Sequence, residues 1–358
     1  MSNESDGVLF EGERIYQTSL YPMLVHHLPG SKVRPLLVFA PGGGHLARIG
    51  YGHPGARRDD FPIPWLNRAG FEVVSISYPS EHAAISARSQ AMTITQWAQC
   101  MAEVVMQAAD SPDSLQARPV VLIGWSMAGR LARSFAVAAR DLGFKNPCFI
   151  SLAATAPIPN LTTPRAGCEP VTASGFWDSS ARSAQWEAEL TAQEQFNDHV
   201  IIPRDLYRRH YHCNNPILLR AETREHVPSA WSMANILDDL GTFEYEQYPL
   251  CAAVVPTIAR DARHVLTDQA TWTFINSQAI YCDLRNRSGN RLAELDEDTW
   301  SSIRKQVAAL SGKLFREVNG GHFFFVGERG ARQTAAHIDE LIEEAATFLR
   351  WRDSLFAS

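Results

Sequence analysis

The stretch PVVLIGWSMAGR, from Pro119 to Arg130, constrains the fold of this chain more than any other part of the sequence. An apolar, β-branched run over residues 119–123 leads into small residues around Ser126. Residues 126–143 then place apolar side chains at helical spacing and end in glycine. Small residues let neighbouring backbone pass close to the serine on both sides. The pattern predicts a strand, a tight turn and a helix, the geometry that an activated serine nucleophile requires.

The composition is that of a large globular core. With 358 residues, 45% of them hydrophobic, the chain can form one large α/β domain with an insertion. A formal net charge of −6 without basic runs argues against a nucleic-acid partner. No stretch approaches the roughly 20 apolar residues of a membrane helix, and the N-terminal residues lack the basic and apolar regions of a secretory signal. We therefore expect a cytoplasmic protein with no membrane and no nucleic acid among its partners.

The cysteines are scattered and show no CxxC spacing. We expect reduced thiols and no structural metal. The six are Cys100, Cys148, Cys168, Cys213, Cys251 and Cys282.

Predicted strands alternate with predicted helices along the chain. Strands are predicted at residues 24–28, 34–40, 72–78, 119–123, 147–154 and 252–259, and helices near residues 64–69, 95–109 and 126–143. Alternation of this kind implies parallel strands joined by crossovers, helices on both faces, and a site at the carboxyl ends of the strands. The expected fold class is therefore α/β, with a mostly parallel central sheet. Residues 109–116 are predicted to be a surface loop.

Residues 157–248 are too many for one crossover and predict a helical cap. The core is then divided into residues 1–156 and residues 249–358. A helix is expected near residues 181–196. Three tryptophans could form an apolar roof over the serine or pack inward as in an ordinary insertion. They are Trp177, Trp186 and Trp231.

The run YRRHYH at residues 207–212 could be a basic, aromatic recognition patch. Its two tyrosines are four residues apart, which places them on one face of a helix. The spacing favours a helix with both tyrosines turned inward and the charged residues in solvent.

A glycine-rich turn, PGGGH at residues 41–45, follows the predicted strand at residues 34–40. Glycine amides can approach a ligand with no side chain in the way. We expect an oxyanion hole formed by the amide of Met127 and that of Gly42 or Gly43.

His45 and Trp125 are candidate substrate-binding residues. His45 directly follows the glycine turn, and Trp125 directly precedes Ser126. Both would lie beside a reacting carbonyl group if the two turns meet at the edge of the sheet.

His322 is the candidate base. It follows a predicted strand and a glycine turn in KLFREVNGGHFFF, residues 313–325. A loop histidine after the last strand completes the chain order serine, acid, histidine, in which the histidine takes the proton of the serine hydroxyl.

Asp261 is the first candidate for the acid, because it directly follows the predicted strand at residues 252–259. It lies 61 residues before His322, whereas Asp298 lies only 24 residues before it. If the stretch from residue 276 to residue 299 is an insertion, the longer separation is explained.

Other residues near these positions keep the assignment open. Asp268 and Asp296 are further candidate acids, and His264 is expected to line the loop rather than to replace His322.

Together these motifs resemble the type II thioesterases of nonribosomal peptide and polyketide assembly lines, members of the α/β hydrolase superfamily. The residues that carry the resemblance are the elbow GWSMAG, the glycine-rich turn, the YPL segment at residues 248–250, and GGHFFF at residues 320–325. The resemblance implies an α/β hydrolase fold with a helical lid. It also implies a thioester substrate on an acyl or peptidyl carrier protein, with phosphopantetheine as part of the substrate and no other cofactor or metal.

The chain departs from that family in length, with extra residues in the cap and before His322. It also resembles the longer acyltransferases that shuttle aminoacyl groups between carrier proteins, although those generally use cysteine where this chain has Ser126. The sequence thus predicts an acyl hydrolase or transferase that uses a Ser126, His322 and Asp261 triad on a carrier-bound thioester. A small-molecule carboxylesterase or C–C hydrolase is the first alternative, and a catalytically inactive binding module is the second.

Overall fold

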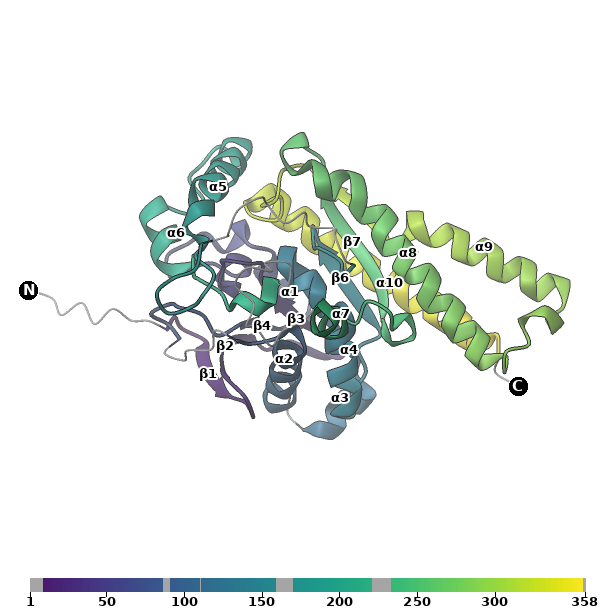
Figure 1. Ribbon diagram of the computed structural model, residues 1–358. Helices are drawn as coiled ribbons and strands as arrows, with labels where there is room; N and C mark the ends of the chain where they lie inside the picture. Colours follow the sequence, from purple (N-terminus) through teal and green to yellow (C-terminus); the bar gives the residue numbers. More distant parts are fainter. Residues whose placement is uncertain (1–8, 86–90, 110, 159–169, 221–232, 357–358) are drawn as a thin grey trace, which may run out of the picture.

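The computed structural model describes residues 9–85, 91–109, 111–158, 170–220 and 233–356 (Figure 1). Within these ranges eight strands form one sheet in the order β1-β2-β4-β3-β5-β6-β7-β8. The strands are β1 (Glu13–Gln17), β2 (Pro22–Leu28), β3 (Ser31–Ala40), β4 (Phe71–Ser77), β5 (Val120–Trp125), β6 (Cys148–Leu152), β7 (Leu250–Pro256) and β8 (Phe315–Val318). β1 and β2 are antiparallel to their neighbours, and the pairs from β4 through β8 are parallel. The carboxyl ends of β3, β5, β6, β7 and β8 therefore meet at one edge.

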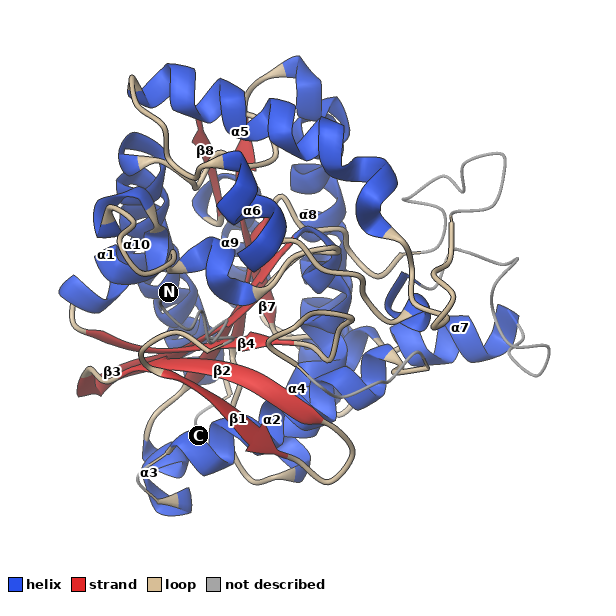
Figure 2. Ribbon diagram, turned by 90° about the vertical axis from the view of Figure 1, so that its left-hand side faces the viewer, coloured by secondary structure: helices blue, strands red, loops and turns tan. Residues whose placement is uncertain are grey.

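Helices cover both faces of the sheet (Figure 2). They are α1 (Pro62–Arg68), α2 (Ile94–Ala108), α3 (Pro112–Ala117), α4 (Leu131–Asp141), α5 (Ser183–Asn197), α6 (Arg204–His210), α7 (Met233–Leu240), α8 (Ala262–Arg287), α9 (Glu297–Lys313) and α10 (Glu328–Ser354). Trp97 of α2 and Phe135 of α4 belong to one buried apolar cluster. Ile63 of α1 and Leu341 of α10 belong to a second cluster on the other face. No helix within the described ranges is both long enough and apolar enough to cross a membrane.

This architecture confirms the predicted α/β hydrolase fold, including the mostly parallel sheet. Several local predictions were incomplete or wrong. Strand β1 and the helices α7 to α10 were not predicted. The loop predicted over residues 109–116 contains α3 instead, because Ser111 caps a helix that has proline in its first turn, a strong start signal.

Helices α5, α6 and α7 lie in the chain between β6 and β7, which are neighbours in the sheet, within the range predicted as a cap. Helices α5 and α6 lie together at one side of the molecule (Figure 1), whereas α7 packs against α2 and α4. Trp177 and Trp186 are buried, and Trp231 lies outside the described residues, as does Cys168.

Helix α6 has the predicted orientation. Tyr207 and Tyr211 are fully buried, and Arg208 is exposed and pairs with Glu187 of α5. The first four residues of the run YRRHYH thus end α6, with both arginines in solvent and both tyrosines turned inward, as the spacing predicted.

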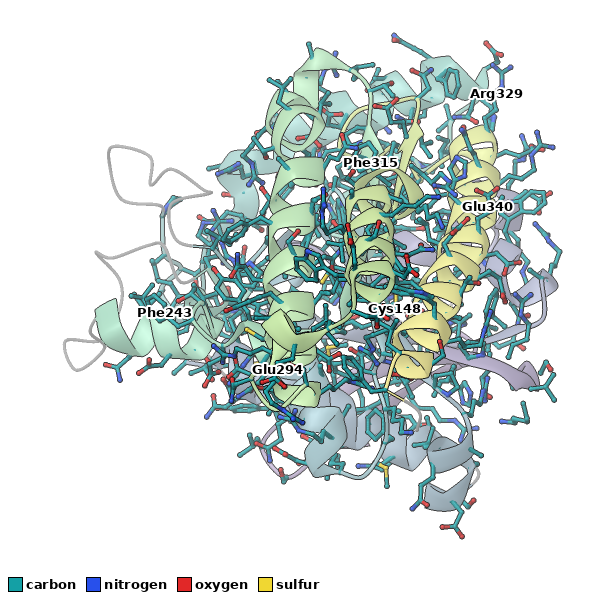
Figure 3. All side chains as sticks on the ribbon, turned by 90° about the vertical axis from the view of Figure 1, so that its right-hand side faces the viewer. Cys148, Phe243, Glu294, Phe315, Arg329 and Glu340 are labelled. Atoms are coloured by element: carbon teal, nitrogen blue, oxygen red, sulfur yellow. The ribbon has the colours of Figure 1, made fainter. Side chains whose placement is uncertain are left out.

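A second insertion, the helical hairpin α8–α9, lies between β7 and β8 in the sequence. Figure 3 shows α8, α9 and α10 side by side, with Glu294, at the turn of the hairpin, at the opposite end of this layer from Phe315. By its 26 residues, α8 is about 39 Å long. The hairpin thus adds many residues between β7 and β8 without separating the two strands.

Candidate active site

Ser126 lies at the turn between β5 and the helix that follows it. Its φ of 53° is in the left-handed region, which costs a non-glycine residue energy and fits a turn held tight by its surroundings. A Cβ on Gly124 would lie 2.9 Å from the carbonyl oxygen of Ala128, and one on Gly129 would lie 2.3 Å from that of Thr155. The turn therefore requires glycine at both positions. The predicted strand, turn and helix are confirmed, with a first turn of 3-10 form (Ser126–Arg130) before α4.

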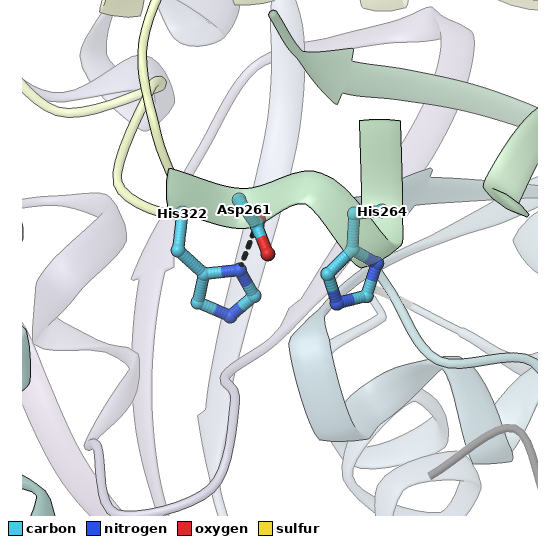
Figure 4. A group of neighbouring side chains, drawn as sticks. All are labelled: Asp261, His264 and His322. Carbon is cyan, nitrogen blue, oxygen red and sulfur yellow. Dashed lines mark hydrogen bonds and ion pairs between the residues drawn. The ribbon is translucent and has the colours of Figure 1, made fainter. Parts of the chain in front are cut away.

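The structure brings His322 between Ser126 and Asp261. His322 Nε2 lies 2.8 Å from Ser126 Oγ, and Nδ1 lies 2.7 Å from Asp261 Oδ2 (Figure 4). Asp261 follows β7, and His322 follows β8, so adjacent parallel strands deliver the two side chains to the same edge of the sheet. Because the carboxylate accepts from Nδ1, Nε2 is left to accept the serine hydroxyl proton.

The electrostatic surroundings keep Asp261 ionised. Burial raises the pKa of this carboxyl group, but the charges and hydrogen bond of His322, with further contributions from His264 and Arg263, lower the pKa to about 2. Asp261 therefore carries its negative charge throughout the neutral range and can hold the imidazole ring in one orientation.

The other candidate acids lie elsewhere. Asp268 is buried on α8 and contacts His264 at 3.0 Å. Asp296 caps the start of α9, where it accepts from the amide of Thr299, and Asp298 lies exposed in the first turn of that helix. Both are thus at the far end of α8 from Asp261. Most of the stretch that separates Asp261 from His322 is the helical hairpin α8–α9, an insertion that is longer than the predicted residues 276–299.

His264 lies on α8 rather than in a loop. It is buried, and its ring centroid lies 5.2 Å from that of His322 (Figure 4). Its Nδ1 faces Asp268, and its Nε2 accepts from Arg263 at 2.6 Å. One ligand atom each from His264, Asp261 and His322 lie within 4.8 Å of one another. The guanidinium group already bound to His264 disfavours a cation at that position.

The glycine turn lies against the serine. A Cβ on Gly42 would lie 2.8 Å from Ser126 Cβ, and one on Gly43 would lie 3.3 Å from Met127 Sδ. Met127 is in the first turn of the helix after β5, where amides have no acceptor within the helix. The backbone around the serine therefore places the amides predicted for the oxyanion hole close to the nucleophile.

Hydrogen bonds to side chains and backbone anchor this turn. The Tyr78 hydroxyl donates to the Gly42 carbonyl at 2.8 Å, His45 Nδ1 to the Gly43 carbonyl at 3.1 Å, and the Gly44 amide to the side chain of Asn215 at 3.1 Å. None of these bonds uses the amide of Gly42 or Gly43.

His45 and Trp125 each form a hydrogen bond to a segment that is distant in the sequence. His45 is 1% exposed, and its Nε2 accepts from the Tyr207 hydroxyl of α6 at 2.6 Å. Burial lowers its pKa well below the ordinary range, so the ring is neutral. Trp125 is equally buried and donates from Nε1 to the carbonyl oxygen of His322 at 3.1 Å. This geometry favours a supporting role over substrate contact for both residues.

Sequence reasoning missed Glu189 of α5. Its carboxylate is buried, and Oε2 accepts the backbone N–H of His322 at 3.2 Å. The one signal in the sequence is that Gln193 and Asn197 extend the buried face of Trp186 and Leu190 with polar groups. That pattern indicates a polar contact but does not say with what.

No protein-family model matches this sequence, and no curated protein matches it either. Similar solved structures include a carboxylesterase from the ammonia-oxidizing thaumarchaeon Nitrososphaera gargenis, with a TM-score of 0.47, 13% identity, and coverage of 94% of this chain and 99% of that one. A thioesterase domain from the curacin biosynthetic pathway has a TM-score of 0.43 and 12% identity, over 94% and 98% of the two chains. A monoglyceride lipase from Saccharomyces cerevisiae has a TM-score of 0.48 and 9% identity, over 97% and 95%. Likenesses at these identities and TM-scores say nothing about the substrate of this chain.

Proposed function

We propose that this chain, which has the α/β hydrolase fold, is a serine-dependent acyl hydrolase that forms an acyl-enzyme on Ser126. The observation that carries the proposal is the continuous chain of hydrogen bonds from Asp261 through His322 to Ser126. A nucleophile, a base and a group that orients the base are the three parts that this chemistry needs.

In the proposed reaction, His322 Nε2 accepts the hydroxyl proton as Ser126 Oγ attacks the acyl carbonyl carbon. Asp261 stabilises the imidazolium that forms. The oxyanion of the tetrahedral intermediate accepts from the amide of Met127 and that of Gly42 or Gly43. His322 then gives its proton to the departing thiol or alcohol. Water, deprotonated by the same imidazole, attacks the acyl-enzyme and releases the acid.

The finer proposal is that the substrate is an acyl thioester on the phosphopantetheine arm of an acyl or peptidyl carrier protein. Its support is the likeness of GWSMAG and GGHFFF to the type II thioesterases. Transfer of the acyl group to a second carrier is the variant of this reaction in which another thiol replaces water. The phosphopantetheine belongs to the substrate in either case, and we expect no resident cofactor and no metal.

A fluorophosphonate probe tests the acyl-enzyme chemistry. We expect the wild type to gain the mass of one probe at Ser126, and Ser126→Ala to gain none. Ser180→Ala, which changes an exposed serine, is the matched control and should react like the wild type. Absence of labelling in the folded wild type would overturn the proposal and favour a binding module without an activated serine.

Intact-mass measurements test the substrate. The protein is mixed with carrier proteins that bear acyl or aminoacyl phosphopantetheine, and in parallel with p-nitrophenyl esters. Loading of Ser126 from the carrier, followed by release to water or to a second carrier, is the expected outcome. Turnover of the simple esters alone would instead assign a small-molecule carboxylesterase.

A further inference from the structure

Helix α5 of the insertion fits against the loop that carries His322. The loop, GGHFFFVG at residues 320–327, has three glycines, and a Cβ on each would collide with a different polar side chain of α5. The Cβ of Gly320 would lie 2.4 Å from Gln193 Nε2, that of Gly321 2.1 Å from Glu189 Oε2, and that of Gly327 2.2 Å from Asn197 Nδ2. The three side chains are spaced four residues apart and so form one row on the helix. Loop and helix are therefore complementary in shape along two turns of α5.

Hydrogen bonds reinforce this fit at both ends of the loop. Glu189 Oε2 accepts the N–H of His322 at 3.2 Å, and Asn197 Oδ1 accepts the N–H of Arg329, at the start of α10, at 3.0 Å. The side chain of Glu189 is only 2% exposed. Because a buried hydrogen bond to a charged group is among the stronger ones, Glu189 restrains the backbone of His322 directly.

The same turn of α5 contacts the residue next to the acid. Arg260 donates from Nη1 to the carbonyl oxygen of Ala188 at 3.0 Å, and its Nε lies 3.8 Å from Glu189 Oε1. Since the side chain of Arg260 is 48% exposed, this ion pair adds little by itself. It does show that α5 touches both loops of the proposed triad.

The carboxylate of Glu189 also interacts electrostatically with the side chain of His322. Burial raises the pKa of this carboxyl group, and the charges of His322 and Arg260 oppose that shift only in part. The imidazole ring of His322 becomes positive during the proposed reaction. A buried carboxylate near that ring stabilises the positive charge. The other charged or titratable groups around His322 are Asp261, Arg263 and His264 from the acid loop and α8, Arg260, and His45 from the glycine turn.

We infer that Glu189 is a positioning residue through which the insertion helix α5 holds the catalytic base in place and stabilises its imidazolium form. The inference rests on the proposed acyl-enzyme chemistry of Ser126. It assigns to the insertion a part in the catalytic step and not only in covering the substrate.

The first test removes the charge of Glu189 and keeps the shape of its side chain. In Glu189→Gln we expect kcat to fall about tenfold, with KM within twofold. The acid limb of the kcat/KM profile, which reports protonation of the base, should move to lower pH because a negative charge near the base is lost. Glu187→Gln, on the same helix but paired with Arg208 on the outside, is the matched control and should leave both kcat and the pH profile unchanged.

The second test uses the close fit at Gly321. Gly321→Ala should lower kcat, because its Cβ displaces the Glu189 carboxylate. In a Glu189→Ala background the same substitution should cost much less, so that the double-mutant cycle is non-additive. Additive effects would show that the glycine acts independently of α5 and would contradict the inference.

Labelling by the fluorophosphonate probe separates the two proposals. If the folded wild type is not labelled at Ser126, the proposed function fails. If it is labelled and Glu189→Gln reacts at the wild-type rate with an unchanged pH profile, only the role of Glu189 fails. Thermal unfolding of each variant shows that a loss of rate does not come from loss of the fold.

Discussion

The pairing of strands in the sheet, and not proximity in the sequence, brings Asp261 beside His322. Adjacent parallel strands, β7 and β8, end at the same edge, so residues 61 positions apart come within 2.7 Å. Asp298 is closer along the chain but lies at the start of α9. Spacing between motifs is therefore a weak guide wherever an insertion can separate two neighbouring strands.

Substitution of each aspartate tests this assignment. Asp261→Asn should reduce kcat by about 10³- to 10⁴-fold, because an amide no longer selects the useful tautomer of His322 or stabilises its positive form. Asp298→Asn should leave kcat within twofold of the wild type. Steady-state rates on whichever ester or thioester is turned over provide the measurement. A large loss in Asp298→Asn would contradict the geometry.

The sequence predicted the position of some of these residues and not of others. Ser126 and His322 each lie in a glycine-containing local pattern, GWSMAG and GGHFFF, that the sequence reveals. The partnership of Glu189 with His322 spans 133 residues and depends on how the insertion folds back. No local pattern contains that information, because the partner of the buried polar face of α5 is a loop far away in the sequence.

At the scale of elements, the α8–α9 hairpin is a spacer whose second helix is capped by a side chain. Asp296 caps α9, accepting from the amide of Thr299 at 2.8 Å and from its hydroxyl group at 2.7 Å. The sequence allowed two interpretations of this stretch, a source of the acid or an insertion. Only the three-dimensional arrangement shows that the hairpin turn is remote from His322.

Loss of this cap should affect stability and not activity. For Asp296→Ala we expect the urea midpoint of unfolding to fall, because the N-cap hydrogen bond to Thr299 is lost, with kcat unchanged. Urea unfolding followed by circular dichroism and the rate assay together check this. Asp296→Ser, which can still cap the helix, should retain most of the stability.

For the whole molecule, the alternation of strands and helices predicted a mostly parallel sheet. The sequence did not predict the electrostatic contacts between its strands. Glu72 at the start of β4 is the clearest example. Its buried carboxylate contacts His27 of β2 and Lys32 of β3, each at 2.7 Å, and Arg118 before β5 at 2.6 Å. A single charge thereby connects four segments at the edge of the sheet opposite the proposed site.

This cluster should make stability depend on pH. Burial raises the pKa of Glu72, but the three partners lower it to about 2, below the ordinary value of 4.5. A group with a depressed pKa in the folded state stabilises the protein above the unfolded-state pKa. That stabilisation is lost as the pH falls from about 4.5 toward 2.

Glu72→Gln should therefore destabilise the protein by about 3 kcal/mol at pH 7, since it also leaves the largely buried Arg118 without its carboxylate. The difference from the wild type should shrink as the pH is lowered through 4 to 3. Urea unfolding at several pH values measures both effects, with the exposed Glu294→Gln as control. A difference that stays constant with pH would rule out the carboxylate charge as its cause.

The loop GGHFFFVG also constrains which substitutions this sequence can accept in evolution. Only His322 of this loop reaches Ser126, whereas its three glycines fit the side chains of α5. A descendant that loses the long side chains of α5 no longer needs glycine at residue 321, and one that gains a side chain there must shorten Glu189. Among descendants of this chain, residue 321 and residue 189 should therefore co-vary, whereas Gly320 and Gly327, with φ of 144° and 93°, should be retained for their backbone conformation as well.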